Sequence, residues 1–503
     1  KTYEKDLAAA EHPKVKQDIQ ILIKSVEDSM ETDRLTSEVM LPYHNVTQLV
    51  FFGIRSLMDP QVAEERRHAA IERIKKYAGI ANGYKPITEL ARADTERVMR
   101  NKGLIGPFIG EVEKDLENAP KFIAGVRQLL ASSALEGWEE PYDTLAKQLE
   151  DYNAWVAEEV KKRARPTSTL PREIYENNLK NWGVDASPEE LIRQAQTAFA
   201  EIRAEMEALA PLVAKEKGYD VTDYRDVILK LREEEIPGDK VLAEYEATLG
   251  KIEEIIEREG IVTLPEREAG IEIASAAETA AQPAPHVRPP RLVGNTGEYP
   301  VFVLPKIEQR EDGSWGNNED NFMANTWTLT AHEARPGHEL QFSAMIEGGV
   351  STARALFSFN SANVEGWGLY AETITKPYMP LDGQLISLQL RLLRAARMFL
   401  DPLINTGQLT PAEAKQFLMQ EVVITDGFAQ QEVDRYAFRL PGQATSYYYG
   451  YAKMRGLRIF TELKLRDKFD QKAFHDFVLA QGLLPPELLR KAVEEEFIPQ
   501  YAG

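Results

Sequence analysis

The chain contains no cysteine among its 503 residues. Disulfide bonds and thiolate metal ligands are therefore excluded, so a metal would have to be bound by histidine or by oxygen ligands. A cysteine-free chain fits an exported bacterial protein, and we expect a periplasmic or secreted location, with a cytoplasmic enzyme as the alternative. The chain begins at Lys1 with neither an initiator methionine nor a hydrophobic signal core, so we expect a mature or trimmed chain.

Long apolar runs and an excess of positive charge are also missing. No apolar run reaches about 18 residues, so we expect no membrane-spanning segment. The 80 acidic residues outnumber the 60 basic ones and give a formal net charge of −20. This charge argues against nucleic acid or an anionic membrane surface as a partner, because both are themselves negative. The oligomeric state stays open.

Helical periodicity dominates residues 1 to about 275, with charged residues between the apolar positions. A chain of this length exceeds the size at which single cores usually divide, so we expect two helical lobes. The stretch 281–290 is too rich in proline for a helix and is the clearest break. We therefore predict an N-terminal helical lobe at 1–280, a connecting segment at 281–297 and a second lobe at 298–503.

Residues 298–305, Glu-Tyr-Pro-Val-Phe-Val-Leu-Pro, predict a short β-strand. Proline cannot donate to a sheet, so Pro300 and Pro305 favour an edge strand over a central one. The backbone groups of an edge strand could pair with an extended peptide. The predicted fold class is mainly α, with this small β element beside the helix described next.

Histidine is scarce, and two of the seven histidines lie six residues apart in His332-Glu-Ala-Arg-Pro-Gly-His338. In the usual His-Glu-x-x-His helix, two histidines one turn apart bind zinc and the glutamate acts as general base. A separation of six residues instead turns two side chains roughly 120° apart on a regular helix. An undistorted helix could therefore not deliver both imidazoles to one ion.

Pro336 and Gly337 can repair this spacing. Proline lacks the amide hydrogen and disfavours a helical residue before it, while glycine takes backbone angles closed to other residues. We interpret the segment as a bulged zinc helix in which His332 and His338 are ligands and Glu333 is the base. The alternative is a core histidine followed by a Pro-Gly helix end.

A zinc hydrolase needs a third protein ligand and an open position. The run from Ala353 to Ile374 reads as a mostly apolar, buried helix, in which acidic residues are costly unless paired or bound to metal. Glu365 and Glu372 lie two turns apart on one face of it. We expect Glu365 to complete the metal site and Glu372 to orient a histidine through its other ring nitrogen, with a surface carboxylate as the alternative for Glu372.

Four segments together resemble, in order, the bacterial family of unknown function numbered 885: His332 to Gln341, Glu365 to Glu372, Arg435 to Tyr447 and Phe474-His-Asp476. That family looks like glutamate-zincin metallopeptidases, distantly similar to helical oligopeptidases. The motifs cover roughly the C-terminal 200 residues. One position departs from the family, because Asn405 stands where we would expect a histidine.

The resemblance also points to a tyrosine. Peptide hydrolysis at zinc passes through a tetrahedral oxyanion, which a tyrosine hydroxyl can stabilise. Tyr447 matches the family's tyrosine after Pro-Gly-Gln, with Tyr448 and Tyr451 as nearby candidates and an aromatic core stripe as the alternative. His475 is either a second oxyanion donor or a buried histidine held by a carboxylate.

These observations predict two helical lobes around a zinc cleft and one Zn²⁺ per chain, bound by His332, His338 and Glu365. Glu333, Tyr447 and His475 are the catalytic candidates. The expected function is a zinc metallopeptidase that cleaves short peptides. Two alternatives remain, a zinc hydrolase acting on a non-peptide amide and a binding or scaffold protein without catalysis.

Overall fold

The computed structural model describes residues 2–58, 62–274, 278–279, 282, 284–309 and 321–502. The chain divides into two compact units, one made of residues 1–29 and 175–503 and the other of residues 30–174. The boundaries predicted from the sequence, at 280 and 297, do not coincide with this division. Within the predicted connecting segment, residues 281 and 283 lie outside the described residues.

The unit of residues 30–174 is helical. Its helices are α3 (Val46–Met58), α4 (Glu64–Arg67), α5 (Ala69–Tyr77), α6 (Ile87–Val98), α7 (Ile109–Ala131) and α8 (Glu139–Trp155), followed by a π-helical turn at Val156–Val160 and a 3-10 turn at Lys161–Arg163. In α8, Tyr142, Leu145, Leu149 and Tyr152 are buried. Their spacing of three and four residues places them on one face, which packs into the unit's apolar core.

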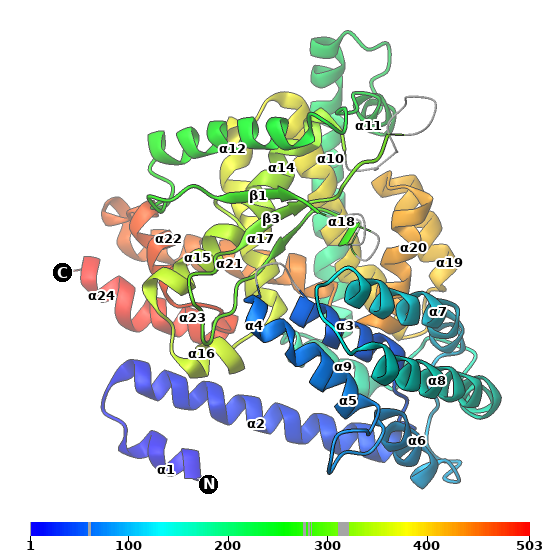
Figure 1. The fold of residues 1–503 in the computed structure, drawn as a ribbon. Coiled ribbons are helices and arrows are strands. Elements are labelled where there is room, and N and C mark those ends of the chain that lie inside the picture. The colour runs from blue at the N-terminus through cyan, green and yellow to red at the C-terminus, as the bar shows by residue number, and fades with distance from the viewer. Residues whose placement is uncertain are drawn as a thin grey trace. The chain divides into compact units, whose positions relative to one another are not determined.

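The larger unit contains the remaining elements (Figure 1). Before the sheet, the chain forms α1 (Thr2–Ala9), α2 (Pro13–Val39, which runs across the division at residue 29), α9 (Arg172–Asn181, which runs across the division at residue 174), α10 (Pro188–Lys217), α11 (Tyr224–Arg232) and α12 (Val241–Arg258). α10 starts at a serine cap, because the Ser187 side chain accepts a hydrogen bond from the Glu190 amide.

After the sheet, the chain is helical again. The helices are α14 (Met323–Glu333), α15 (His338–Gly348), α16 (Thr352–Phe357), α17 (Ser361–Thr375), α18 (Leu381–Asn405), α19 (Pro411–Phe417), α20 (Asp426–Asp434), α21 (Thr445–Leu465), α22 (Gln471–Ala480), α23 (Pro486–Ala492) and α24 (Ile498–Ala502), with π-helical turns at Leu418–Val422, Arg435–Arg439 and Val493–Phe497 and 3-10 turns at Lys376–Tyr378 and Arg466–Lys468. The mainly α fold class is therefore confirmed. No helix in the described part of the chain is long and apolar enough to cross a membrane.

The sheet has three strands in the order β1 (Gly270–Ile273), β3 (Val301–Leu304), β2 (His286–Arg288). β3 pairs in parallel with β1 and antiparallel with β2. The predicted strand at 298–305 is confirmed, but its placement at an edge is wrong. The paired segment runs from Val301 to Leu304. Pro300 and Pro305 therefore lie just outside it, and neither removes a hydrogen bond from the sheet.

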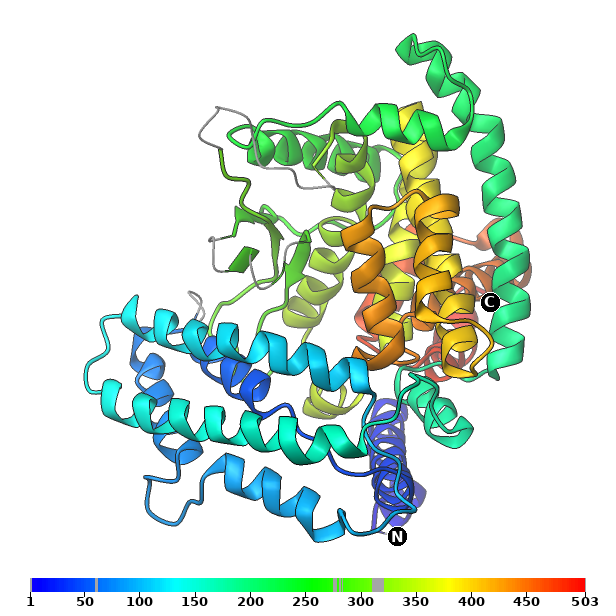
Figure 2. The ribbon, with the colours of Figure 1, turned by 90° about the vertical axis from the view of Figure 1, so that its right-hand side faces the viewer.

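Helices α17, α18 and α21 pack against one another in the core of the larger unit, and α10 runs beside α18 (Figure 2). Gly366 and Gly450 bring α17 and α21 into close contact, since a Cβ on Gly450 would lie 1.8 Å from the Ala362 carbonyl oxygen. The single helix predicted from 353 to 374 is wrong. It is two helices, because Asn360 caps a new helix by accepting a hydrogen bond from the Asn363 amide at 2.8 Å.

Candidate metal centre

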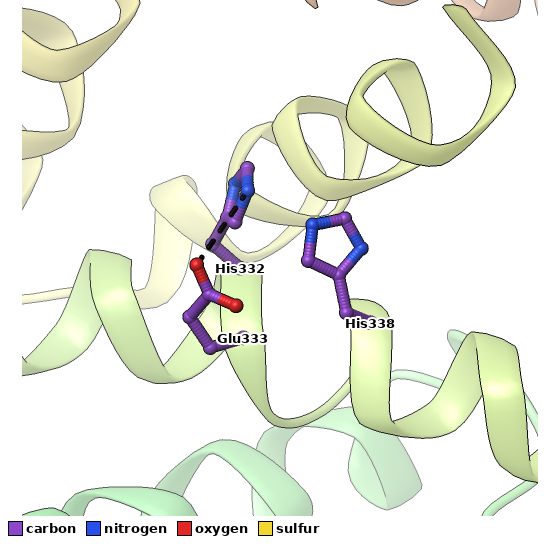
Figure 3. Close-up of side chains that lie close together, drawn as sticks. All are labelled: His332, Glu333 and His338. Carbon is purple, nitrogen blue, oxygen red and sulfur yellow. Dashed lines mark ion pairs between the residues drawn. The ribbon is translucent and has the colours of Figure 1, made fainter. Parts of the chain in front are cut away.

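The two motif histidines stand on either side of a break between helices (Figure 3). α14 ends at Glu333 and α15 begins at His338, so His332 lies in the last turn of one helix and His338 in the first turn of the next. Residues 334–337, which include Pro336 and Gly337, lie outside both helices, so the predicted departure from helical backbone is confirmed. The interruption is more complete than the predicted bulge within one helix. The two imidazole centroids lie 4.7 Å apart.

Glycine is required at the break. A Cβ on Gly337 would lie 1.8 Å from the carbonyl oxygen of His332, so any larger residue would push the two histidines apart. The Trp367 indole on α17 donates a hydrogen bond to the Pro336 carbonyl at 2.9 Å, which ties the link to the neighbouring helix. The link between the two helices, residues 334–337, is therefore held by the close packing at Gly337 and by the hydrogen bond from Trp367. Together they fix the spacing of the two histidines.

Arg335, also within the break, is almost fully buried, at 2% exposure. Its guanidinium donates to Glu339 at 2.8 Å, to Glu253 at 2.7 Å and to the Arg267 carbonyl at 3.0 Å. Each side of the fork has an acceptor, which is what a buried guanidinium requires. Arg335 therefore joins α15 and α12 beneath the link.

Glu365 approaches both histidines from α17. One carboxylate oxygen, Oε2, lies 3.5 Å from the Nε2 of His332 and 3.5 Å from the Nε2 of His338. Ligand atoms bound at 2.0–2.1 Å around a tetrahedral zinc lie roughly 3.3–3.4 Å apart. The two separations between the Glu365 oxygen and the histidine nitrogens therefore match the distance between neighbouring ligand atoms of a tetrahedral zinc site.

Glu333 lies beside this set with its two oxygens in different surroundings. Oε1 is 4.0 Å from the Nε2 of His332, and Oε2 accepts a hydrogen bond from the Val287 amide on β2 at 2.9 Å. Ligating atoms of His332, Glu333 and His338 all fall within 4.8 Å of one another. Glu365 is not part of that group, but one of its oxygens is equidistant from the Nε2 atoms of both imidazoles, while Glu333 is already held by a backbone donor.

Glu372 lies on the other side of His332. Its Oε1 accepts a hydrogen bond from the Nδ1 of His332 at 2.7 Å, and its side chain is fully buried. This bond fixes the tautomer that leaves Nε2 free for a metal. Gly368, one turn before Glu372, makes room for the ring, since a Cβ there would lie 2.5 Å from the Cε1 of His332.

The charges of the site favour a cation. Burial alone would lower the pKa of His332, but the interactions with Glu365 and Glu372 outweigh it and raise the pKa to about 9. Burial likewise opposes ionisation of Glu365, yet His332 and His338 hold its pKa well below the ordinary value. A proton is thus held where a metal would sit, and metal and proton compete for the same nitrogen.

Tyr447 stands near these groups at the start of α21. Its hydroxyl accepts a hydrogen bond from Arg435 at 3.1 Å, and the guanidinium of Arg397 lies 4.5 Å from its ring centroid. Burial raises the pKa of Tyr447, and the Glu365 carboxylate raises it further, while Arg435 lowers it. The phenol therefore remains protonated within electrostatic range of the proposed ligand and keeps its own hydrogen for donation.

His475 is placed elsewhere. It is fully buried, its Nδ1 lies 2.7 Å from the Ile261 carbonyl oxygen, and its Nε2 lies 2.7 Å from the Tyr370 hydroxyl. With both ring nitrogens engaged, it has no donor left for an oxyanion. It is a buried histidine, but Asp476 does not hold it, because that carboxylate accepts from Thr263.

Asn405, where the family pattern would have a histidine, is also buried and away from the ligands. Its side chain donates to Asp401 at 3.0 Å and to the Tyr436 carbonyl at 3.0 Å. Asp401 in turn accepts from Tyr175 at 2.9 Å and from the Gly442 amide. Asn405 therefore supports the loop that precedes Tyr447.

Sequence reasoning missed several residues around the site. Val287 lies in the segment interpreted as a connection, and its amide became visible as a contact of Glu333 only in three dimensions. Arg391, Arg394 and Arg397 are each at most 7% exposed on α18. Their spacing of three residues in an otherwise apolar helix was the signal that could have revealed a buried basic face.

Comparison with known proteins gives the class of this chain. The family described as "Bacterial protein of unknown function (DUF885)" matches residues 1–493, so the chain belongs to that family. The resemblance seen in the sequence is thereby confirmed. No curated protein matches the chain.

Two solved structures share the fold. One, from Shewanella oneidensis, is described as a "putative lipoprotein of unknown function"; it has a TM-score of 0.76 and 19% identity, and the match covers 98% of this chain and 90% of that one. A second, from Colwellia psychrerythraea, is described as a "putative lipoprotein". It has a TM-score of 0.70 and 19% identity, and the match covers 89% of this chain and 78% of that one. At this identity the likeness shows the fold alone.

Proposed function

We propose that this protein is a zinc-dependent hydrolase that cleaves short peptides, with one Zn²⁺ per chain. The observation that carries the proposal is the single Glu365 oxygen lying 3.5 Å from the Nε2 atoms of both His332 and His338. Three ligands with nitrogen and oxygen donors, and part of the carboxylate exposed, are the arrangement expected of a catalytic rather than a structural zinc site. When bound, the zinc would polarise the scissile carbonyl and make water a stronger acid.

Glu333 is the proposed general base. The Val287 amide holds one of its oxygens, so the other is left to take a proton from water and pass it to the leaving amine. Tyr447 is the proposed oxyanion donor. Because its hydroxyl oxygen accepts from Arg435, its hydrogen is directed away from that arginine and can be donated to the developing negative charge.

Peptide as the substrate class is supported by strand β2. It is an edge strand in the order β1-β3-β2, and Val287 turns its amide away from β3 toward Glu333. In an antiparallel strand the N–H and C=O of one residue point to the same side, so the Val287 carbonyl faces the same space. An extended peptide could pair with β2 beside the proposed base Glu333. Peptide pairing, which the sequence predicted for residues 298–305, is therefore proposed for β2 instead.

An envelope location, periplasmic or secreted, is part of the same proposal. It is supported by the absence of cysteine and by the bacterial lipoproteins that share the fold. Fractionation of the native host, with the protein followed by antibody, would test it. Recovery in the cytoplasm would contradict this part alone.

The function is tested by elemental analysis of the purified protein together with digestion of a defined peptide mixture. We expect about one zinc per chain, loss of hydrolysis on chelation, and new termini identified by mass spectrometry. Glu333→Gln is the matched control for contaminating peptidases, since it keeps the size and polarity of the side chain. Cleavage that survives in this variant, or a protein that binds no zinc, would overturn the proposal.

A further inference from the structure

The two ring nitrogens of His338 have different surroundings. Nε2 lies 3.5 Å from the Glu365 oxygen, whereas Nδ1 is buried and has no hydrogen-bond partner among the described residues. In His332, by contrast, Nδ1 is held by Glu372 at 2.7 Å. A histidine that binds a metal through Nε2 carries its hydrogen on Nδ1, and this N–H is almost always donated to an acceptor. His338 therefore needs an acceptor of the kind that His332 already has.

The helix that carries His338 also carries a buried acceptor without a donor. In α15, all of whose residues are described, two buried side-chain nitrogen or oxygen atoms have no partner: the Nδ1 of His338 and the Oε1 of Gln341. The Nδ1 of a metal-bound histidine is a donor, and an amide oxygen is an acceptor. The two atoms are therefore complementary, and each would satisfy the other.

Neighbouring hydrogen bonds fix which end of the Gln341 amide carries the oxygen. The Nδ2 of Asn363 donates to the Leu484 carbonyl at 2.7 Å, so the Oδ1 of Asn363 is the end that accepts. This Oδ1 accepts from the Nε2 of Gln341 at 3.0 Å. Turning either amide round would bring two acceptors together. The Oε1 of Gln341 is therefore the end that is left for a further donor.

The geometry of α15 brings the two side chains together. His338 and Gln341 are three residues apart, so they are neighbours on one face of the helix, with Cβ atoms about 5–6 Å apart. Helical side chains lean toward the N-terminus of their helix, which directs Gln341 back over the turn that carries His338. Both side chains face α17, where His338 meets Glu365. Gln341 meets the same helix at Asn363.

We propose that Gln341 is the positioning residue of His338. Its Oε1 accepts a hydrogen bond from Nδ1 and so holds the ring with Nε2 toward the metal. The inference rests on the proposed function, because it requires a metal at His338. Gln341 acts on His338 as Glu372 acts on His332, but it is neutral and adds no charge to the site. Through Asn363, it also connects this ligand to the chain between α22 and α23.

The experiment compares the zinc affinity of the full chain with that of two variants, by competition with a chromophoric chelator. Gln341→Leu removes the acceptor and should weaken zinc affinity about 10–100-fold, the range for partners of metal-bound histidines. Gln341→Glu keeps an acceptor and should bind zinc much more tightly than Gln341→Leu. Both variants lose the hydrogen bond to Asn363, so a role in structural support alone predicts no such rescue.

Gln389→Leu is the matched control. Gln389 is a glutamine of α18 with 2% exposure, and it donates to the Val422 and Val423 carbonyls at 3.0 and 3.1 Å. Its replacement should lower the thermal midpoint without changing zinc affinity. If Gln341→Leu does not fold, a crystal structure of the zinc-loaded wild type decides. We expect the Nδ1 of His338 and the Oε1 of Gln341 about 2.7–3.2 Å apart.

Three results would overturn the proposal while the wild type still binds zinc and cleaves peptide. The first is a wild-type zinc affinity in Gln341→Leu, and the second is a loss of zinc from Gln341→Glu as large as that from Gln341→Leu. The third is a crystal structure in which the Nδ1 of His338 donates to another acceptor. A wild type that binds no zinc would overturn the proposed function together with this inference, so the two failures are distinguishable.

Discussion

The two compact units bury very different side chains. Among the described residues of 30–174, the buried positions are apolar or aromatic, with a few threonines and one serine, and none is charged. The unit of residues 1–29 and 175–503 buries histidines, carboxylates and arginines. Glu372 and Asp401 have no exposed surface there, and Arg335 has 2%. Both units have apolar clusters of similar make-up, so an ordinary core does not require these charges.

Buried charge is expensive unless it is paired or bound to an ion. The larger unit meets that cost with specific partners, such as Glu432, whose carboxylate receives two hydrogen bonds from Arg397 at 2.7 Å. The Arg397 charge helps to overcome the effect of burial and lowers the pKa of Glu432 to about 2. The buried charges and the candidate site therefore lie in the larger unit, whereas the other unit is held by apolar packing.

The largest effect expected from this contrast is on catalysis. Glu333→Gln in the larger unit should lower hydrolysis by several orders of magnitude while zinc stays bound, because the amide cannot accept the proton. Turnover and zinc content are measured on the same preparation. Glu113→Gln, an exposed carboxylate paired with Lys161 in the other unit, should change neither. Near-normal turnover of Glu333→Gln would refute its role as base.

The next effect is on metal binding through the backbone. Gly337→Ala should lose most bound zinc, because the new Cβ would meet the His332 carbonyl oxygen at 1.8 Å and separate the ligands. Gly125→Ala in the other unit brings a Cβ within 2.8 Å of the Phe51 ring, a side chain of an apolar core. It should lower the thermal midpoint with full zinc content. Equal zinc loss in both variants would contradict the prediction that only the larger unit binds zinc.

A smaller effect concerns acid stability. Burial lowers the pKa of His475 from the ordinary histidine value of 6.5 to about 4. The unfolded chain therefore binds this proton first, and stability falls as the pH drops from about 6.5 to 4, by up to about 3 kcal/mol. Urea unfolding of wild type and His475→Gln across this range measures it. If the two proteins lose stability in parallel, His475 is not the cause.

The smallest effect separates two carboxylates of α17. Glu372→Ala should weaken zinc affinity only about 10–100-fold, since it orients His332 without touching the metal. Glu365→Ala should empty the site under the same dialysis against a mild chelator. Zinc retained by Glu365→Ala but lost from Glu372→Ala would mean that their roles are reversed.

Much of the fold and of the candidate site could be predicted from the sequence, because the sequence patterns that indicate them are local. Helical periodicity and the interruption at Pro336-Gly337 depend on neighbouring residues, and both appear in the structure as expected. That His332, His338 and Glu365 lie close together was also predictable. A carboxylate in an apolar helix demands a partner, and the two histidines were the partners predicted for Glu365.

Only the tertiary structure decided how distant segments meet. In the sheet, β3 pairs with a strand on each side, and β2 becomes an edge strand beside Glu333. It also enclosed His475 between Ile261 and Tyr370, far from each in sequence, so that a histidine with a suggestive neighbour has no free nitrogen. A hydrogen bond between segments more than a hundred residues apart leaves no periodic trace in the sequence, because it depends on how whole helices pack.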